Sequence, residues 1–241
     1  RLMKVLITGA TSGIGWQLAH DYLDEGHDVI AVGRKPQALA VLKDKGAKVL
    51  ALDLTDRQAT LDGLAGLGPL NLAILNAGTC EYLDMPDFDS AAFIRVMRAN
   101  VESMAISIEG VLPCLIGCEG ARLVGVASAA AYLPLPRAEA YGASKAAIRY
   151  LFDTLDITLA RQGVAVSTVF PGFVKTPLTD KNDFAMPMQL SAQDAARYIR
   201  RGIDKGQRHI HFPKAFTWTL QLLGLLPQGL WRRLAKRIIK A

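Results

Sequence analysis

Continuous apolar runs of strand length alternate with amphipathic stretches along most of this 241-residue chain. Runs without polar interruption are typical of strands buried on both faces of a parallel sheet. The runs cover residues 4–8, 27–33, 47–53, 71–78, 121–128 and 164–172, with a further short one around 208–212. The amphipathic stretches lie at about 13–25, 35–44, 56–65, 88–112, 140–162 and 191–204. This alternation predicts an α/β fold, a doubly wound parallel sheet with helices on both faces and right-handed crossovers.

Because no Pro-, Gly- or Ser-rich linker divides the chain, we expect one domain over residues 3–212, followed by a distinct extension over residues 213–241. The extension reads AFTWTLQLLGLLPQGL at 215–230 and WRRLAKRIIK at 231–240. Its apolar part is too short to span a bilayer and is interrupted by glycine and proline. Two alternatives stay open. The extension packs on the domain or on a second subunit, or it lies on an anionic membrane surface.

The net charge of +6 is unevenly distributed. Residues 205–241 contain four lysines, four arginines and no acidic residue, whereas residues 1–204 carry a net charge of −2. This balance argues against a nucleic-acid partner, because the main body of the protein is not basic. Three cysteines are an odd and sparse set that does not make a disulfide framework, which favours a cytoplasmic location.

The glycine-rich stretch TGATSGIG, residues 8–15, directly follows the first apolar run. It lacks the G-x-G-x-x-G spacing of the familiar dinucleotide fingerprint. Gly9 nevertheless permits a sharp turn, and Gly13 and Gly15 let the backbone approach a ligand where the next helix begins. Free N–H groups and the positive end of the helix dipole at that point favour a pyrophosphate. The alternative is a tight connection between strand and helix without a ligand.

In doubly wound sheets ligands bind beyond the carboxyl ends of the strands, so the residues that end each apolar run are candidates for binding. The second run ends in VGRKP, at a place where an acid would bind a free adenosine ribose and repel a 2′-phosphate. Gly33 leaves room there, and Arg34 offers a permanently charged fork that suits phosphate. Arg34 therefore favours NADP over NAD, the alternative being a solvated surface arginine.

Small or polar residues also follow the other runs, namely Asp53, Asn76, Ala77, Gly78, Pro171, Gly172 and Thr176. Asp53 is placed to meet an adenine amino group, although an aspartate at such a junction is also a common helix N-cap. Asn76 can pair with the backbone, and the Thr176 hydroxyl can reach a carboxamide or a phosphate.

Ser128 ends the fifth run, thirteen residues before Tyr141, and Lys145 follows the tyrosine by four residues. Positions i and i+4 share one face of a helix, so the phenol and the ammonium point the same way. A nearby ammonium lowers the pKa of a tyrosine towards the range that is useful for acid–base catalysis. Ser128 can hold a substrate oxygen against that phenol. The competing interpretation is a Tyr and a Lys on an exposed helix face, because Y-x-x-x-K is frequent by chance.

Taken together, TGxxxGIG, NAG, Asn100, Ser128, YxxxK and PGxxxT occur in an order and at spacings that resemble the short-chain dehydrogenase/reductase family over about residues 3–212. The resemblance implies a Rossmann-like fold and hydride transfer between a nicotinamide cofactor and a carbonyl/alcohol pair, as in a carbonyl reductase or alcohol dehydrogenase. It implies no metal ion, because the cofactor supplies the hydride and the protein supplies orientation and a proton. It also implies a homodimer or homotetramer formed through the helices at 88–112 and 140–162.

The resemblance further implies a role for each catalytic residue. Tyr141 would be the general acid in reduction and the base in oxidation. Lys145 would lower the pKa of Tyr141 and hydrogen-bond the nicotinamide ribose. Ser128 would orient the substrate oxygen, and Asn100 would hold a water in a proton relay to Lys145.

For the cofactor, the resemblance implies a pyrophosphate turn made of Gly9, Ser12, Gly13, Ile14 and Gly15. The other cofactor-binding residues that it implies are Asp53 and Leu54 beside adenine, Asn76, Ala77 and Gly78 beside a ribose, the Pro171–Gly172 turn, and Val174 and Thr176 at the carboxamide. Some NADP-dependent members carry a basic residue where this chain has Ser12. The expectation of NADP(H) rather than NAD(H) therefore rests on Arg34, with Lys35 a lesser contributor.

Residues 177–190, PLTDKNDFAMPMQL, are expected to form a lid over the site. Their apolar content favours a hydrophobic small-molecule substrate. Two other functions stay open, the same chemistry with NAD(H) and a catalytically idle NADP(H)-binding regulator. The complete Ser, Tyr, Lys and Asn set argues against the regulator, since a protein that only binds the cofactor need not keep a proton donor.

Overall fold

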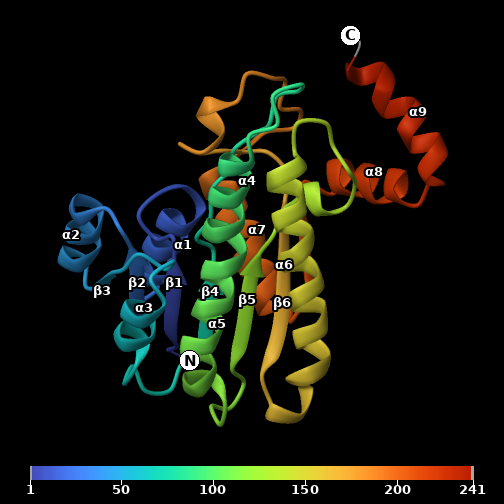
Figure 1. Cartoon of the computed structure of the whole chain (residues 1–241). Helices are drawn as coiled ribbons and strands as arrows, with labels where there is room; N and C mark the ends of the chain where they lie inside the picture. Colours follow the sequence, from blue (N-terminus) through green and yellow to red (C-terminus); the bar gives the residue numbers. More distant parts are fainter. Residues whose placement is uncertain (1, 240–241) are drawn as a thin grey trace.

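The computed structural model describes residues 2–239, and its centre is a seven-stranded parallel sheet (Figure 1). The strand order is β3-β2-β1-β4-β5-β6-β9. The strands are β1 (Lys4–Thr8), β2 (Asp28–Gly33), β3 (Lys48–Ala51), β4 (Leu72–Leu75), β5 (Arg122–Val126), β6 (Ala165–Pro171) and β9 (His209–Phe212). Each of them lies within one of the seven apolar runs, and every neighbouring pair is parallel. The predicted doubly wound parallel sheet is confirmed.

Helices cover both faces of the sheet. The α-helices within the described residues are α1 (Gly13–Asp24), α2 (Pro36–Asp44), α3 (Arg57–Leu64), α4 (Ser90–Met97), α5 (Ser103–Leu115), α6 (Glu139–Thr158), α7 (Ala192–Asp204), α8 (Lys214–Gly224) and α9 (Gln228–Ile239). One face packs against α1, α2 and α7, and the other packs against α3, α5 and α6 (Figure 1). Along the strands, the side chains pack alternately into one core and then into the other. Ile74, for example, faces the first and Leu75 the second.

Short polar side chains begin several of the helices. The Asp56 carboxylate accepts the Ala59 N–H at the start of α3, and Asp89 plays the same part at α4. At the start of α7, the Ser191 hydroxyl accepts the Asp194 N–H at 3.0 Å. Such caps satisfy N–H groups that have no partner within the helix.

The connection from β6 to β9 departs from the predicted right-handed crossovers. The chain moves along the sheet in one direction from β1 to β2 and in the opposite direction from β6 to β9, yet α1 and α7 lie on the same face. The two connections therefore have opposite hands. The cause is the long excursion between β6 and α7, in which β7 (Val174–Lys175) and β8 (Leu190–Ser191) pair with each other outside the main sheet. That excursion carries the chain over the carboxyl edge before α7 begins, so the rule for simple strand–helix–strand units does not apply.

The predicted helix at 88–112 is divided in two. A π-helical segment, Arg98–Glu102, separates α4 from α5. Insertions of this kind are rare and are frequent at functional sites. The segment carries Asn100, one of the predicted site residues, in a fully buried position.

We expect the close contact between α6 and β5 to limit what residue 125 can be. Gly125 lies on β5, and a Cβ atom there would overlap the buried ring of Phe152 on α6. Replacing Gly125 by alanine should lower the free energy of unfolding by about 1–3 kcal/mol, the usual cost of overpacking a core. Urea denaturation would measure this loss, and the double variant Gly125→Ala/Phe152→Leu should recover part of it.

Gly229→Ala is the matched control for that experiment. A Cβ at Gly229 on α9 would meet no atom within 4 Å, so this substitution should leave the unfolding midpoint unchanged or slightly raised. A Gly125→Ala variant that is as stable as the parent would show that the contact is not tight.

Candidate active site

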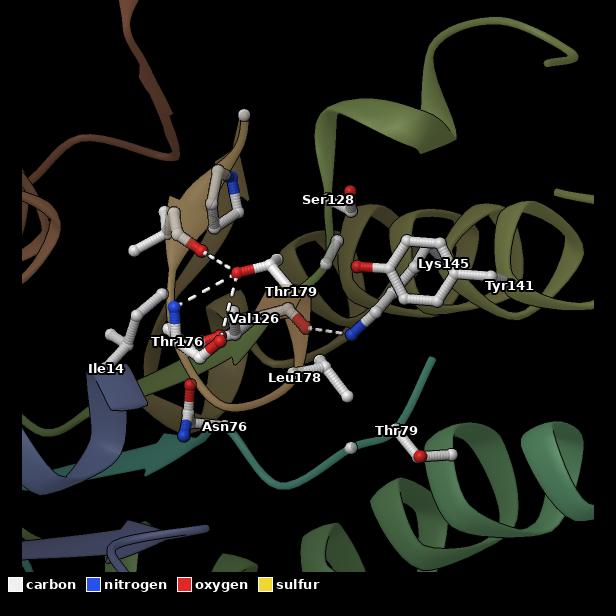
Figure 2. A pocket seen from close by; sticks show the side chains of 15 residues that line it. Ile14, Asn76, Thr79, Val126, Ser128, Tyr141, Lys145, Thr176, Leu178 and Thr179 are labelled. Carbon is white, nitrogen blue, oxygen red and sulfur yellow. Dashed lines mark hydrogen bonds between the residues drawn. The ribbon is translucent and has the colours of Figure 1, made fainter. Parts of the chain in front are cut away.

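A pocket of about 110 Å³ lies at the carboxyl edge of the sheet, where several strands end (Figure 2). It brings together ten of the predicted site residues, Ile14, Asn76, Gly78, Ser128, Tyr141, Lys145, Pro171, Gly172, Val174 and Thr176. The other lining residues are Thr79, Val126, Ala127, Leu178 and Thr179. The remaining predicted residues do not line it, namely Gly9, Ser12, Gly13, Gly15, Arg34, Asp53, Leu54, Ala77 and Asn100.

The glycine-rich turn is packed tightly between the end of β4 and the start of the lid. A Cβ at Gly9 would lie 2.8 Å from the Ala77 Cα, and one at Gly15 would overlap the Gly9 carbonyl. Gly13 has a φ of +57°, which favours glycine, and a Cβ there would come within 3.1 Å of the Thr176 Cγ2. At each of these three glycines, a side chain would come too close to a different neighbour.

The turn leaves the start of α1 open towards a ligand. Ser12 occupies the N-cap position in extended backbone, but its side chain makes no capping hydrogen bond, and the first turn holds no acidic residue. Ile14, in that first turn, lines one side of the pocket (Figure 2). Uncapped N–H groups at the positive end of a twelve-residue helix suit an anion. These residues therefore fit the pyrophosphate of a dinucleotide.

The end of β2 holds the residues expected at the adenosine. Arg34 is exposed directly after Gly33. A Cβ at Gly33 would overlap the Thr11 side chain, so the room that was expected at Gly33 is occupied by Thr11. Sequence reasoning missed Thr11, although it lies inside the glycine-rich stretch and carries a hydroxyl. Thr11 and Arg34 together offer a hydroxyl and a guanidinium to an anion beside this strand.

One oxygen of the Asp53 carboxylate accepts hydrogen bonds from within its own turn. Its Oδ1 accepts the Thr55 N–H at 3.0 Å and the Thr55 hydroxyl at 2.7 Å. These hydrogen bonds, helped by the charge of Arg34, hold the pKa of Asp53 below its usual value. The next residue, Leu54, points its side chain into the core, so only its backbone can face a ligand.

The helix α6 presents Tyr141 and Lys145 to the pocket one turn apart, as predicted (Figure 2). The Lys145 Nζ donates to the Val126 carbonyl at 3.1 Å and lies 5.7 Å from the centre of the Tyr141 ring. The Ser128 Oγ accepts the Ala130 N–H at 3.1 Å, which leaves its own proton for a ligand oxygen. The serine, the phenol and the ammonium therefore face one space.

Burial controls the pKa values of this pair. It raises the pKa of Tyr141 above its ordinary value, and the Ser128 hydroxyl acts in the opposite direction. Burial also lowers the pKa of Lys145 to about 8. The expected lowering of the Tyr141 pKa by the ammonium is therefore not what this structure gives. Removing water from both groups favours their neutral forms, and this burial is the largest cause of the shift in each pKa.

Asn100 lies behind the pocket. Its Oδ1 accepts the Thr79 N–H at 2.7 Å, and its Nδ2 donates to the Thr79 carbonyl and to the Ser144 hydroxyl, both at 2.9 Å. Gly78 lies between Asn100 and Lys145. A Cβ atom at this position would be 2.9 Å from the Asn100 Oδ1 and 3.6 Å from the Lys145 Nζ. Asn100 therefore positions the segment after β4 through its side chain.

Arg137 joins three loops around the mouth of the pocket, and nothing in the sequence pointed to it. Its guanidinium donates to the Asp84 Oδ1 and to the Asp183 Oδ1, each at 2.7 Å, and lies 5.8 Å from the centre of the Tyr82 ring. Phe184, on the lid, meets the same ring edge-on at 5.1 Å. The lid is therefore held against the loops that follow β4 and β5.

Because Lys145 is buried, we expect that removing its charge stabilises the folded protein. Below pH 8 the lysine is protonated in both states, and only the folded state bears the cost of keeping the ion away from water. Lys145→Met should therefore raise the free energy of unfolding by about 1–3 kcal/mol at pH 7. Between pH 8 and 10.5 the folded state loses the proton before the unfolded chain does, so the parent gains stability and the difference shrinks.

Thermal unfolding of the parent and of Lys145→Met at pH 7 and pH 10 would measure this difference. The exposed Lys48→Met is the control and should change little at either pH. A Lys145→Met variant that unfolds at a lower temperature than the parent at pH 7 would mean that the ammonium stabilises the fold.

The sequence also matches known proteins. The family model described as short chain dehydrogenase matches residues 3–186. An uncharacterized oxidoreductase of Myxococcus xanthus is 32% identical over 243 residues, which cover 97% of this chain and 96% of that protein.

Two solved structures have a similar fold. A short chain dehydrogenase from Burkholderia cenocepacia, in complex with NADP, has a TM-score of 0.87 and 23% identity, covering 97% of this chain and 98% of that one. A short chain dehydrogenase/reductase from Burkholderia phymatum, in complex with NAD, has a TM-score of 0.81 and 24% identity, covering 92% of each chain. The family model and the relative from Myxococcus xanthus show that this chain belongs to the short-chain dehydrogenase/reductase family.

Proposed function

We propose that the protein is an NADP(H)-dependent oxidoreductase that interconverts a carbonyl and an alcohol, with Tyr141 as general acid and base. The observation that carries the proposal is the meeting of Ser128, Tyr141 and Lys145 in one pocket that adjoins the uncapped start of α1. The similar folds from Burkholderia cenocepacia and Burkholderia phymatum, which hold NADP and NAD, support a nicotinamide cofactor. When bound, that cofactor supplies or accepts the hydride.

The residues of this chain then handle the proton. Ser128 donates its free hydroxyl proton to the substrate oxygen and holds that oxygen beside the phenol. Burial keeps Tyr141 protonated, which suits an acid that must deliver its proton to an oxygen gaining negative charge. As the proton leaves, Lys145 is the cation beside the phenolate that forms. In the direction of oxidation the same phenolate takes the proton back.

Asn100 enters this proposal as a positioning residue. Both N–H donors of its amide are already used by Thr79 and Ser144. A water that relays protons to Lys145 would therefore have to be held by groups other than that amide nitrogen.

For the parts of the molecule around the site, we propose a catalytic domain over residues 3–212 and a cytoplasmic location. Leu178 in the pocket and Phe184 on the lid support an apolar substrate. A homodimer or homotetramer would form through α4, α5 and α6, where Ile94, Tyr150 and Ile157 are exposed. Hydride transfer with NAD(H) and a non-catalytic NADP(H)-binding regulator remain the alternative functions.

Tyr141→Phe tests the chemistry. Removing the proton donor should lower kcat/KM for a reducible ketone or aldehyde by roughly 10²–10⁴-fold, whereas the dissociation constant of NADPH should stay within a few-fold. Consumption of NADPH over a panel of carbonyl compounds measures the first quantity, and quenching of NADPH fluorescence measures the second. Tyr82→Phe, whose ring lies 6.4 Å from that of Tyr141, is the control and should cost far less. A parent protein that binds NADPH and reduces no member of the panel would support the regulator instead.

Arg34→Ser tests the choice of cofactor. A charge-assisted hydrogen bond to the 2′-phosphate is worth about 1.5–3 kcal/mol, so kcat/KM for NADPH should fall roughly 10–150-fold while that for NADH changes little. Lys35→Ser, at the neighbouring exposed lysine, should have a smaller effect. Steady-state kinetics with both cofactors measure the change. Equal losses with NADPH and NADH would reject a 2′-phosphate site at Arg34.

A further inference from the structure

The last two helices leave a stripe of large apolar side chains in solvent. Trp218, Leu222 and Leu225 are 52%, 66% and 82% exposed. Their spacing of four and three residues puts them on one side of α8 and of the turn that follows it. Neighbouring exposed apolar side chains of this size are typical of a surface that contacts another protein, a ligand or a membrane.

This stripe remains after the helices have already packed on the domain. The inner side of α8 buries Leu220 against the segment that follows Ser128, and its buried Thr217 hydroxyl lies 2.6 Å from the His211 Nδ1 of β9. From α9, the Trp231 Nε1 donates to the Pro134 carbonyl at 2.9 Å. The hairpin of α8 and α9 is thereby fixed through its inner side and extends to one side of the domain (Figure 1). Its outer side is a preformed surface.

The charged side chains of the extension are all of one sign. Lys214 lies with its Nζ 5.5 Å from the centre of the Trp218 ring. On α9 four basic side chains are exposed. Arg232 and Lys236 line a groove between α9 and the domain, whereas Arg233 and Arg237 lie outside it. No acidic residue occurs in residues 205–241. Two copies of such a surface would repel each other, so a second copy of this chain is a poor occupant, whereas an anionic apolar surface matches both properties.

We propose that the hairpin of α8 and α9 docks on the surface of an anionic lipid bilayer. The apolar stripe enters the boundary between headgroups and acyl chains, and Arg233 and Arg237 of α9 lie at the lipid phosphates. The chain lies on the bilayer in this arrangement, since no helix within residues 2–239 is both long and apolar enough to cross it. The proposal concerns the extension alone and does not depend on the reaction at the carboxyl edge of the sheet.

Flotation of the full chain with lipid vesicles tests the proposal. The probes are vesicles of phosphatidylcholine alone and of phosphatidylcholine with phosphatidylglycerol, at low and at high salt. The parent should bind the anionic vesicles and be partly released by salt. Arg233→Gln/Arg237→Gln should lower the partition coefficient on anionic vesicles roughly 30-fold at low salt, from about 1 kcal/mol for each basic residue. Leu222→Ser/Leu225→Ser should weaken binding at both salt concentrations.

Matched control variants separate position from composition. Val41→Ser/Ile116→Ser removes two apolar side chains that are 49% and 45% exposed on other parts of the surface. Lys48→Gln/Arg161→Gln removes two exposed positive charges from the main body. Both controls should bind vesicles as the parent does. All four double variants should keep the circular dichroism of the parent, and any activity that the parent shows on a water-soluble carbonyl compound.

Several results would overturn the proposal. They are a parent that does not bind anionic vesicles, equal binding to neutral and anionic vesicles, and hairpin variants that bind as well as their controls. Light scattering supplies a further one. If Leu222→Ser/Leu225→Ser lowers the oligomeric mass of the protein in solution, the stripe is covered by a second copy of the chain and not by lipid.

Discussion

The contact between the Phe152 ring and the backbone of Gly125 sets the distance between α6 and the sheet. Two turns earlier on the same helix, Lys145 reaches the carbonyl of Val126, the residue that follows Gly125 on β5. Any side chain at position 125 would move the helix away and take Tyr141 out of line with Ser128. The candidate active site therefore depends on a strand residue that has no side chain and does not touch the pocket.

The candidate active site also contains features that lower the stability of the folded state. A phenol and an ammonium are buried side by side, and burial pushes both towards their neutral forms. The first turn of α1 is left without a side-chain cap, and Arg137, which holds the lid, has a φ of +67°. Proteins commonly concentrate such unfavourable features at functional sites. The remainder of the sheet, with two cores of aliphatic side chains, provides the stability that these features reduce.

Most of the fold could be predicted because its signals are local. The apolar runs identify all seven strands of the main sheet, and the spacing of Tyr141 and Lys145 places both on one face of α6 whatever the rest of the chain does. Gly9, which was expected to permit a sharp turn, has a φ of +65°. Each of these features depends on a few neighbouring residues, which is why pattern and spacing suffice.

The features that could not be predicted depend on residues far apart in the sequence. Arg137 and Asp183 are 46 residues apart, and no periodicity relates them. The hand of the last crossover depends on the face of the sheet to which the long segment between β6 and α7 brings the chain. The direction of the Tyr141 pKa shift depends on how much water the folded pocket excludes, and a four-residue spacing carries no information about that.

The unusual last crossover also has a mechanical consequence. Because α7 returns to the same face as α1, Ala195 and Ile199 of α7 share a core with Leu18 of α1. The other end of the excursion also meets that helix, since a Cβ at Gly13 would lie 3.1 Å from the Thr176 side chain. The segment 177–190 is therefore tied to α1, the helix whose first turn presents the open N–H groups, directly at one end and through α7 at the other. A substitution that shifts α1 is expected to displace both ends of that segment together.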